Sequence, residues 1–188
     1  PTHMNIILDE IESTRPHHLS NLKWLILNGE AIPNKVYNRW LQAYPNITMI
    51  TTYGATECSD DISHYKVPKM IHPDEGFLPI SGLLDNLTIY VLDEYLSPVP
   101  IGTIGEIYIG GIGVGRGYLK EPERTDKVFL DDPFSKIPNA RIYKTGDLGR
   151  WLDNGLIESM GRTDHQIKIR GFRVELGEIE SVLQAVEG

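Results

Sequence analysis

An apolar run, an amphipathic segment and a second β-rich run follow one another between residues 24 and 51, and this succession constrains the fold. The first run, WLIL at 24–27, has the pattern of a strand buried on both faces. Pro33 suits the first turn of a helix. The apolar residues after it recur at helical spacing: Val36, Tyr37, Trp40, Leu41 and Tyr44. With the run ITMIT at 47–51, the sequence predicts a βαβ unit with parallel strands and a right-handed crossover.

This unit brings two loops to one edge of its sheet. Ligands of open α/β sheets bind in the crevice at the carboxyl ends of the strands. The segments that follow the two predicted strands are Asn28 to Ala31 and Thr52 to Glu57, so we expect both to line one site. They contain glycine, carboxylate, hydroxyl and aromatic groups, which suit a nucleotide ligand.

From about residue 86 the pattern changes to short β-rich runs separated by Gly, Pro and Asp turns. Asn154-Gly155 between two such runs is a strong hairpin signal. We expect a small antiparallel barrel or sheet, with a surface connection at 120–139 that contains a short helix at 122–129. The expected strands are 87–91, 106–109, 142–144, 149–152 and 156–159.

A third unit is predicted to begin near Arg162. Residues 166–174 alternate between apolar and polar across Gly171, as a hairpin does, and residues 176–186 then follow the pattern of an amphipathic helix. At the other end of the chain, the apolar run at 6–8 fits a buried element.

Charge and composition exclude several classes of protein. The 188 residues carry 26 acidic and 18 basic side chains, a formal net charge of −8, which disfavours a nucleic-acid surface. No apolar run approaches the ~20 residues that span a bilayer, and no signal peptide is recognisable, so we expect a cytoplasmic protein without membrane contact. The single cysteine, Cys58, excludes an internal disulfide, and a structural metal is not expected.

A glycine-rich stretch at 110–117 resembles a phosphate-binding loop at first sight. It does not fit: G-x-G-x-x-G starting at Gly111 would need glycine where Arg116 stands, and no G-x-x-x-x-G-K-[ST] occurs in the chain. We interpret these glycines as positions where the backbone turns sharply or passes close to another segment.

Three polar groups each allow a functional and a structural interpretation. Thr56 and Glu57 follow a strand, where they could contact phosphate and Mg²⁺ or merely cap a helix. Asp147, in a glycine turn, could accept hydrogen bonds from a ribose diol or cap its own backbone. Arg162 and Asp164 could bind phosphate or ribose and form a hinge, or could be a surface ion pair.

Four segments in this order resemble the later core motifs of adenylate-forming enzymes. The last of them, which contains GEIE at 177–180, is most similar to adenylation domains of nonribosomal peptide synthetases, and the resemblance covers essentially the whole chain. The segments are TYGATE at 52–57, GEIYIGG to RGYL at 105–119, YKTGDL at 143–148, and 161–180.

The resemblance implies an ATP-dependent acid–thiol ligase. A carboxylate substrate, an amino or related acid, attacks the α-phosphate of ATP to give an acyl-adenylate and pyrophosphate. The acyl group then passes to the phosphopantetheine thiol of a peptidyl carrier protein. The alternatives are an acyl-coenzyme A ligase of the same superfamily and a non-catalytic scaffold or interaction piece of a synthetase.

The same resemblance assigns roles to particular residues. It implies that Glu57 coordinates Mg²⁺ and Thr56 binds phosphate, and that Asp164 is the hinge of a C-terminal lid. The implied nucleotide-binding residues are Gly29, Glu30, Tyr53, Asp147 and Arg162. The implied substrate-pocket residues are Ile26, Asn28, Thr52, Asp60 and Asp61, where the two carboxylates favour a cationic or polar substrate side chain.

Departures from the family pattern limit what the chain can do alone. Ala55 replaces a common proline, and Ser159 stands where the family usually has an aromatic residue. The family's phosphate loop and amine-binding Asp belong upstream and its catalytic Lys downstream, so we expect a fragment of a larger synthetase, inactive by itself.

We expect residues 1–85 to end an α/β core subdomain, 86–163 to form a β-barrel subdomain, and 164–188 to begin an α+β lid.

Overall fold

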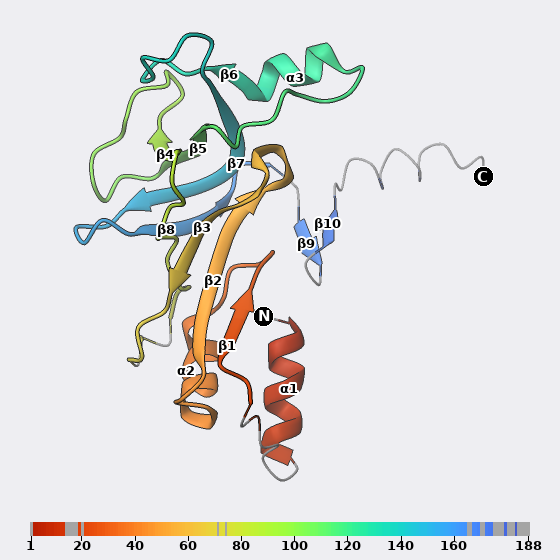
Figure 1. The fold of residues 1–188 in the computed structure, drawn as a ribbon, viewed down its shortest axis with the longest axis vertical. Helices are drawn as coiled ribbons and strands as arrows, with labels where there is room; N and C mark the ends of the chain where they lie inside the picture. The colour runs from red at the N-terminus through yellow and green to blue at the C-terminus, as the bar shows by residue number, and fades with distance from the viewer. Residues whose placement is uncertain are drawn as a thin grey trace.

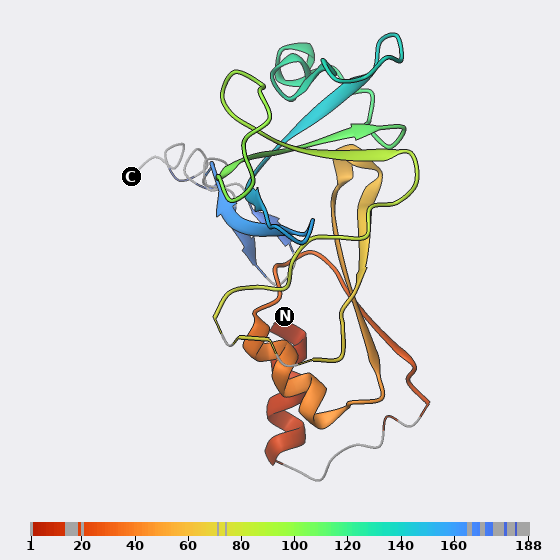
Figure 2. The same ribbon diagram turned by 90° about the vertical axis from the view of Figure 1, so that its left-hand side faces the viewer.

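The structure is a computed structural model that describes residues 2–13, 19, 21–70, 72–73, 75–164, 167–169, 172–174, 179 and 183. A lower part contains two helices and a three-stranded sheet, and an upper part contains a second, antiparallel sheet (Figure 1). The long β2–β3 hairpin runs from the lower part up to the antiparallel sheet, as both ribbon views show (Figure 2).

The predicted βαβ unit is present. Strand β1 (Trp24–Leu27) pairs in parallel with β2 (Thr48–Ala55), and α2 (Asn34–Ala43) connects them. Strand β3 (Asp60–Lys66) adds antiparallel to β2, which sequence analysis did not predict. Because β3 supplies hydrogen-bond partners for four more residues, β2 continues through 52–55, the segment that we expected to be a loop.

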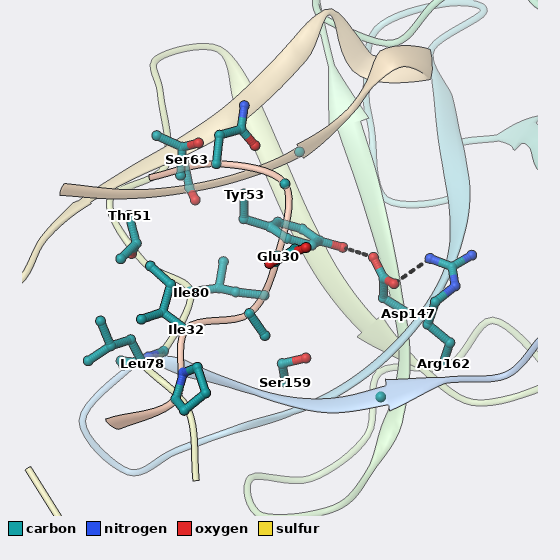
Figure 3. Close-up of a pocket in the computed structure, with 18 of the residues that line it drawn as sticks. Glu30, Ile32, Thr51, Tyr53, Ser63, Leu78, Ile80, Asp147, Ser159 and Arg162 are labelled. Atoms are coloured by element: carbon teal, nitrogen blue, oxygen red, sulfur yellow. Dashed lines mark hydrogen bonds and ion pairs between the residues drawn. The ribbon is translucent and has the colours of Figure 1, made fainter. Parts of the chain in front are cut away.

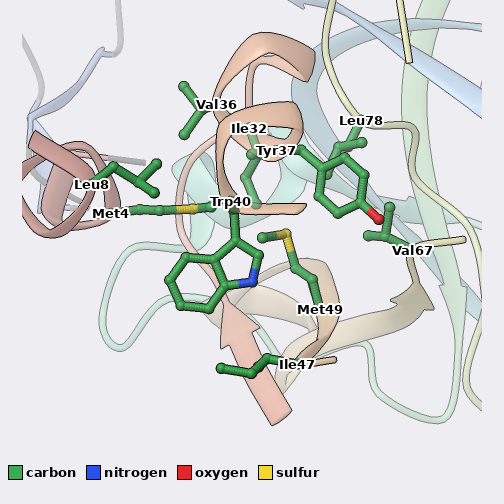
Figure 4. Packing of buried hydrophobic residues seen from close by; sticks show 10 residues of the cluster. All are labelled: Met4, Leu8, Ile32, Val36, Tyr37, Trp40, Ile47, Met49, Val67 and Leu78. Carbon is green, nitrogen blue, oxygen red and sulfur yellow. The ribbon is translucent and has the colours of Figure 1, made fainter. Parts of the chain in front are cut away.

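The core of the lower part lies between the helices and one face of this sheet. Trp40 and Tyr37 of α2 pack with Met49 of β2 and with residues of α1 (Thr2–Ser13) (Figure 4). The expectation for residues 6–8 was right for Leu8 alone, which is buried, whereas Ile6 and Ile7 are exposed. A helix turns successive side chains by 100°, so three consecutive residues cannot all face one core.

The prediction that β1 is buried on both faces was wrong. Leu25 and Leu27 pack against the core, but Trp24 and Ile26 are 48% and 62% exposed. Successive residues of a strand face opposite sides of its sheet, so Trp24 and Ile26 lie on the face away from the core that Leu25 and Leu27 contact. A continuous apolar run therefore identified the strand without revealing what covers its second face.

The upper part is a five-stranded sheet in the order β4-β5-β7, with β6 and β8 both pairing with β7. Its elements are β4 (Leu87–Leu92), β5 (Gly105–Gly111), α3 (Pro122–Val128), β6 (Phe129–Asp131), β7 (Arg141–Trp151) and β8 (Ile157–Arg162). The two strands expected at 142–144 and 149–152 are the single strand β7, and a turn at 152–156 joins it to β8 as predicted. Within the described strands β4 pairs only with β5, so no closed barrel is found among them and barrel closure stays a prediction.

The segment from Phe77 to Leu84 connects the two parts. The Leu78 amide donates to the carbonyl of Ile32 at 2.9 Å. Ile80 and Ile157 of β8 exchange two backbone hydrogen bonds of 2.8 and 3.0 Å, and the His64 amide of β3 donates to Gly82 at 2.8 Å. This extended segment therefore fixes the lower sheet beside β8, and the space between them becomes a pocket.

The third unit begins with the predicted hairpin. Strands β9 (Ile167–Ile169) and β10 (Phe172–Val174) pair antiparallel. The helix expected over 176–186 lies almost entirely outside the described residues. None of the helices described has both the length and the apolar character needed to cross a bilayer.

Candidate functional site

A pocket of about 630 Å³ lies between the lower sheet, the connecting segment and strands β7 and β8. This volume is in the range of small-molecule sites. The pocket is lined by residues 28–33 after β1, residues 51–54 of β2, Ser63, residues 78–80, and Asp147, Ser159, Gly161 and Arg162, together with Thr2. As the βαβ pattern predicted, the ends of β1 and β2 thus contribute to one site.

Three polar side chains form a row along one wall of the pocket. The Tyr53 hydroxyl donates to Oδ2 of Asp147 at 2.7 Å, and Nη1 of Arg162 donates to Oδ1 of the same carboxylate (Figure 3). Both carboxylate oxygens therefore accept hydrogen bonds from side chains in the pocket. The Asp147 carboxylate does not cap its own backbone, which was the alternative interpretation.

Register irregularities position these side chains. A β-bulge follows Tyr53 in the β2–β3 ladder, and in the β5–β7 ladder the residues between Lys144 and Leu148 depart from regular pairing. Asp147 and Arg162 are register partners across β7 and β8. Bulges change the direction in which a strand presents its side chains and are frequent beside functional sites. Here they bring residues of two sheets together.

Buried hydrogen bonds hold the irregular part of β7 in place. The Thr145 hydroxyl, buried in the sheet, donates to the Ile107 carbonyl at 2.7 Å and accepts from the Asp147 amide at 3.0 Å. The Gly146 amide donates to Glu106 at 3.1 Å. These bonds fix the backbone at residues 145–147, and the Asp147 carboxylate points to Tyr53 and Arg162.

The electrostatics of the row follow from burial and charge. Burial, and then the negative charge of Asp147, hold the pKa of Tyr53 well above its usual value of 10.0, so this residue remains a hydrogen-bond donor at physiological pH. Burial lowers the pKa of Arg162, but its hydrogen bonds and ion pairs with Asp164 and Asp147 outweigh this and raise it overall. Arg162 is therefore a permanent cation at the pocket wall.

Arg162 also pairs with the residue expected to be a hinge. Its Nε and Nη2 donate to the two oxygens of Asp164 at 2.7 and 2.8 Å, and Nη2 also donates to the Thr145 carbonyl at 3.1 Å. The Arg162 side chain is only 17% exposed. Asp164 is 47% exposed, so the ion pair that we considered as the alternative is present and lies partly at the surface.

The structure brings together seven of the predicted site residues and places six elsewhere. Those that line the pocket are Asn28, Gly29, Glu30, Thr52, Tyr53, Asp147 and Arg162. Those outside its lining are Ile26, Thr56, Glu57, Asp60, Asp61 and Asp164. Asp61 nevertheless contacts a pocket-lining residue, because the side-chain amide of Asn28 donates to its Oδ1 at 3.0 Å. The Nε2 atom of His64 lies 3.3 Å from Oδ2 of Asp61.

Thr56 and Glu57 form the short helix η1 (Thr56–Cys58) at the tip of the β2–β3 hairpin. The tip packs against the glycine-rich stretch: the Gly115 amide donates to the Glu57 carbonyl at 2.7 Å, and a Cβ at Gly115 would lie 2.9 Å from that oxygen. This confirms that the glycines allow close backbone approach. The Glu57 carboxylate accepts a hydrogen bond of 2.7 Å from Tyr118, so it does not act simply as a helix cap.

Sequence analysis missed several pocket residues. Ser63 lies on the unpredicted strand β3, and Leu78, Pro79 and Ile80 belong to a connection without any repeating pattern. No local signal identifies them, because they reach the pocket through pairing with distant segments: Ser63 with β2, Leu78 with Ile32, and Ile80 with β8. Thr145 lies within a recognised motif, but its burial depends on β5.

Solved structures with the same fold include two adenylation proteins. The Vibrio cholerae adenylation domain AlmE, in complex with glycyl-adenosine-5'-phosphate, matches 99% of this chain with a TM-score of 0.84 and 29% identity, and the chain covers 34% of it. An artificially fused adenylation–PCP di-domain from Klebsiella oxytoca matches 98% of the chain with a TM-score of 0.81 and 25% identity, and the chain covers 33% of it. The fold is therefore that of part of an adenylation protein.

Sequence comparison gives the family. The family described as AMP-binding enzyme matches residues 1–119, and the chain belongs to this family. Tyrocidine synthase 3 of Brevibacillus parabrevis is 42% identical over 171 residues, which make up 90% of this chain. The chain spans only 3% of the length of that relative.

Proposed function

We propose that this chain is part of an ATP-dependent adenylation domain of a nonribosomal peptide synthetase. The domain would activate an amino or related acid as an acyl-adenylate and load it on a phosphopantetheine carrier protein. The observation that carries the proposal is the Tyr53–Asp147–Arg162 row beside a pocket of about 630 Å³, in a chain of the AMP-binding family. The names of the similar synthase and of the fused adenylation–PCP protein favour a carrier protein over free coenzyme A.

The pocket wall suits the nucleoside part of ATP. A carboxylate can accept two hydrogen bonds from a ribose diol, and Asp147 already accepts two from Tyr53 and Arg162. We propose that the diol takes the place of one or both of these donors, while the Tyr53 ring packs on adenine. Gly29 and Glu30, which also line the pocket, would border the base, and the Arg162 cation would bind ribose or phosphate oxygen.

In the first step a carboxylate oxygen of the substrate would attack the α-phosphorus. The P–O bond to the β-phosphate breaks, and pyrophosphate leaves with the bonding electrons. In the second step the carrier thiol loses its proton and attacks the acyl carbon, and AMP leaves. Donors that lie in place before negative charge develops lower the barrier of such steps. We propose that the hydroxyl of Thr56, an exposed residue, is one of them.

The residues near Thr56 fit a Mg²⁺ ion that is shared with phosphate. The described residues contain no group of three or more His, Cys, Asp and Glu that could hold a metal alone. Mg²⁺ in nucleotide sites is typically held by one or two carboxylates and the substrate phosphates. We propose that Glu57, half-buried and directed by Tyr118, is that carboxylate. Bound Mg²⁺ would neutralise charge on the phosphate groups.

The acyl pocket would lie where Thr52 and Asn28 face the cavity. The Thr52 hydroxyl oxygen is buried and has no hydrogen-bond partner within the described residues, so a polar ligand atom would satisfy it. Asp61, held by Asn28, would act with Asp60 and Ile26 at the edge of this pocket. We retain the preference for a cationic or polar substrate side chain.

The remaining expectations belong to the same proposal. Asp164 would be the hinge of the lid that begins at residue 164, residues 1–85 and 86–163 would be two subdomains of the core, and the second would close into a barrel. The partners would be the substrate acid, the carrier protein and the rest of the synthetase. The cytoplasmic location stays a prediction.

Amino-acid-dependent ATP–pyrophosphate exchange by the intact polypeptide tests the proposal. We expect exchange with one or a few amino acids, with Lys, Orn or Arg preferred over aliphatic acids. Preference for an aliphatic acid would contradict the role of Asp60 and Asp61 but not adenylation itself. Absence of both exchange and ATP binding, with motifs intact, would instead favour a scaffold.

A further inference from the structure

Tyr118 lies outside the pocket, yet it contacts the one residue for which a metal role is proposed. Its hydroxyl donates to Oε1 of Glu57 at 2.7 Å, across 61 residues of sequence. A short hydrogen bond to a carboxylate is among the stronger kinds in proteins and fixes the orientation of the acceptor. Tyr118 therefore limits where the Glu57 carboxylate can point.

The Tyr118 ring is itself held from several directions. The Arg124 guanidinium lies 4.5 Å from its centroid, and the Phe129 ring meets it edge-on with centroids 5.6 Å apart. Its backbone amide donates to the Thr125 hydroxyl at 2.9 Å. A side chain with this many neighbours on α3 and β6 loses little further freedom when it binds Glu57.

The backbones of the two segments are also joined. Arg141 of β7 donates to the carbonyls of Gly115 and Arg116, and the Ser59 hydroxyl donates to the Gly113 carbonyl at 3.0 Å. The Ser59 contact and the hydrogen bond from Gly115 to Glu57 hold the glycine-rich stretch against the tip of the β2–β3 hairpin, and Arg141 holds it to β7. The backbone of Gly115 and the adjoining side chain of Tyr118 thus both contact Glu57.

We propose that Tyr118 is a positioning residue that orients the Glu57 carboxylate for a divalent cation. The inference rests on the function proposed above. Groups that hydrogen-bond to metal ligands typically change metal affinity by about 10- to 100-fold when they are removed. Tyr118 would not touch the nucleotide or the reacting atoms, and it would act through Glu57 alone.

The test is a double-mutant cycle in the intact polypeptide, with Tyr118→Phe, Glu57→Gln and the double variant. Mn²⁺ replaces Mg²⁺ in the presence of a non-hydrolysable ATP analogue, and its affinity is measured by electron paramagnetic resonance. We expect Tyr118→Phe to weaken Mn²⁺ binding about 10-fold and to raise the Mg²⁺ concentration needed for exchange, with no further loss in the Glu57→Gln background.

Tyr90→Phe is the matched control, because Tyr90 of β4 also donates to a carboxylate, that of Asp132 at 3.4 Å, but packs in a different hydrophobic cluster from Tyr118. Equal Mn²⁺ affinity in Tyr118→Phe and Tyr90→Phe, with weakened binding in Glu57→Gln, would overturn the positioning role and leave the proposed function standing. Unchanged Mn²⁺ binding in Glu57→Gln would instead refute the metal role of Glu57. Circular dichroism spectra verify that each variant is folded.

Discussion

The Tyr53 hydroxyl and the Asp147 carboxylate, 94 residues apart in the chain, form a hydrogen bond of 2.7 Å that joins the parallel part of the fold to the antiparallel sheet. Tyr53 lies on β2 and Asp147 on β7, each beside a register irregularity. Arg162 completes the contact from β8. One carboxylate thus links three strands of two sheets at the wall of the pocket.

Removal of this carboxylate should weaken nucleotide binding. We expect Asp147→Ala to reduce ATP affinity about 10- to 100-fold, because hydrogen bonds to a charged group contribute about 1.5–3 kcal/mol. Tyr53→Phe, which keeps the ring, should have a smaller effect. Isothermal titration calorimetry with ATP checks both, and the fold should persist because Arg162 keeps its partner Asp164.

Glu158→Gln is the matched control for Asp147→Ala. Glu158 pairs with Arg150 at 2.7 Å across the same β7–β8 ladder but does not line the pocket. ATP affinity equal to wild type in Asp147→Ala, or an equal loss in both variants, would remove Asp147 from the nucleotide site.

Glu57→Gln should lower amino-acid-dependent exchange about 100-fold, the equivalent of about 3 kcal/mol of lost transition-state stabilisation. The amide has the same shape and still accepts a hydrogen bond from Tyr118, so the melting temperature should change little. Glu94→Gln, at an exposed position, is the control. An exchange rate in Glu57→Gln that equals that of the control would exclude Glu57 as a metal ligand.

Gly54→Ala should destabilise the fold severely. A Cβ at Gly54 would lie 1.6 Å from the Asp60 carbonyl oxygen, and backbone atoms of the β2–β3 bulge cannot move away cheaply. We expect a loss of at least about 3 kcal/mol in unfolding free energy, measured by urea denaturation. Gly102→Ala, which meets nothing within 4 Å but has a φ of +82°, should cost only about 1 kcal/mol. Similar losses in both would refute the steric explanation.

Cys58 should resist thiol reagents. It is fully buried, and burial, followed by the charge of Glu57, raises the pKa of its thiol to about 12. The thiolate is the reactive form, so almost none is present at pH 8. Peptide mapping by mass spectrometry after iodoacetamide treatment should find Cys58 modified in urea but not in the native protein. Rapid native labelling would show that η1 opens readily.

Local pattern in the sequence was sufficient for the regular elements of the fold. The apolar spacing after Pro33 predicted α2, and the pairing of β1 with β2 followed from their alternation with a helix. Asn154-Gly155 predicted the hairpin between β7 and β8. These features depend on interactions between residues that are close in the sequence, or on the single helix that connects two strands. A local sequence pattern therefore contains the information that specifies them.

The candidate site shows where sequence pattern was no longer sufficient. Sequence analysis identified Tyr53, Asp147 and Arg162 one by one and by family resemblance, but not that they form one hydrogen-bonded row. It also missed Ser63 and Ile80, and it gave no reason for the contact between Tyr118 and Glu57. Each of these features depends on contacts between segments that are distant in the sequence but adjacent in the structure.

The sequence by itself determined the βαβ unit, the change to short antiparallel strands near residue 86, and which residue types could serve a nucleotide. Only the tertiary structure decided that β2 continues to Ala55, that Trp24 and Ile26 face outward, and that bulges direct Tyr53 and Asp147 toward each other. The physical reason is that strand ends, burial and side-chain direction depend on hydrogen-bond partners from distant segments, and a local pattern does not contain those partners.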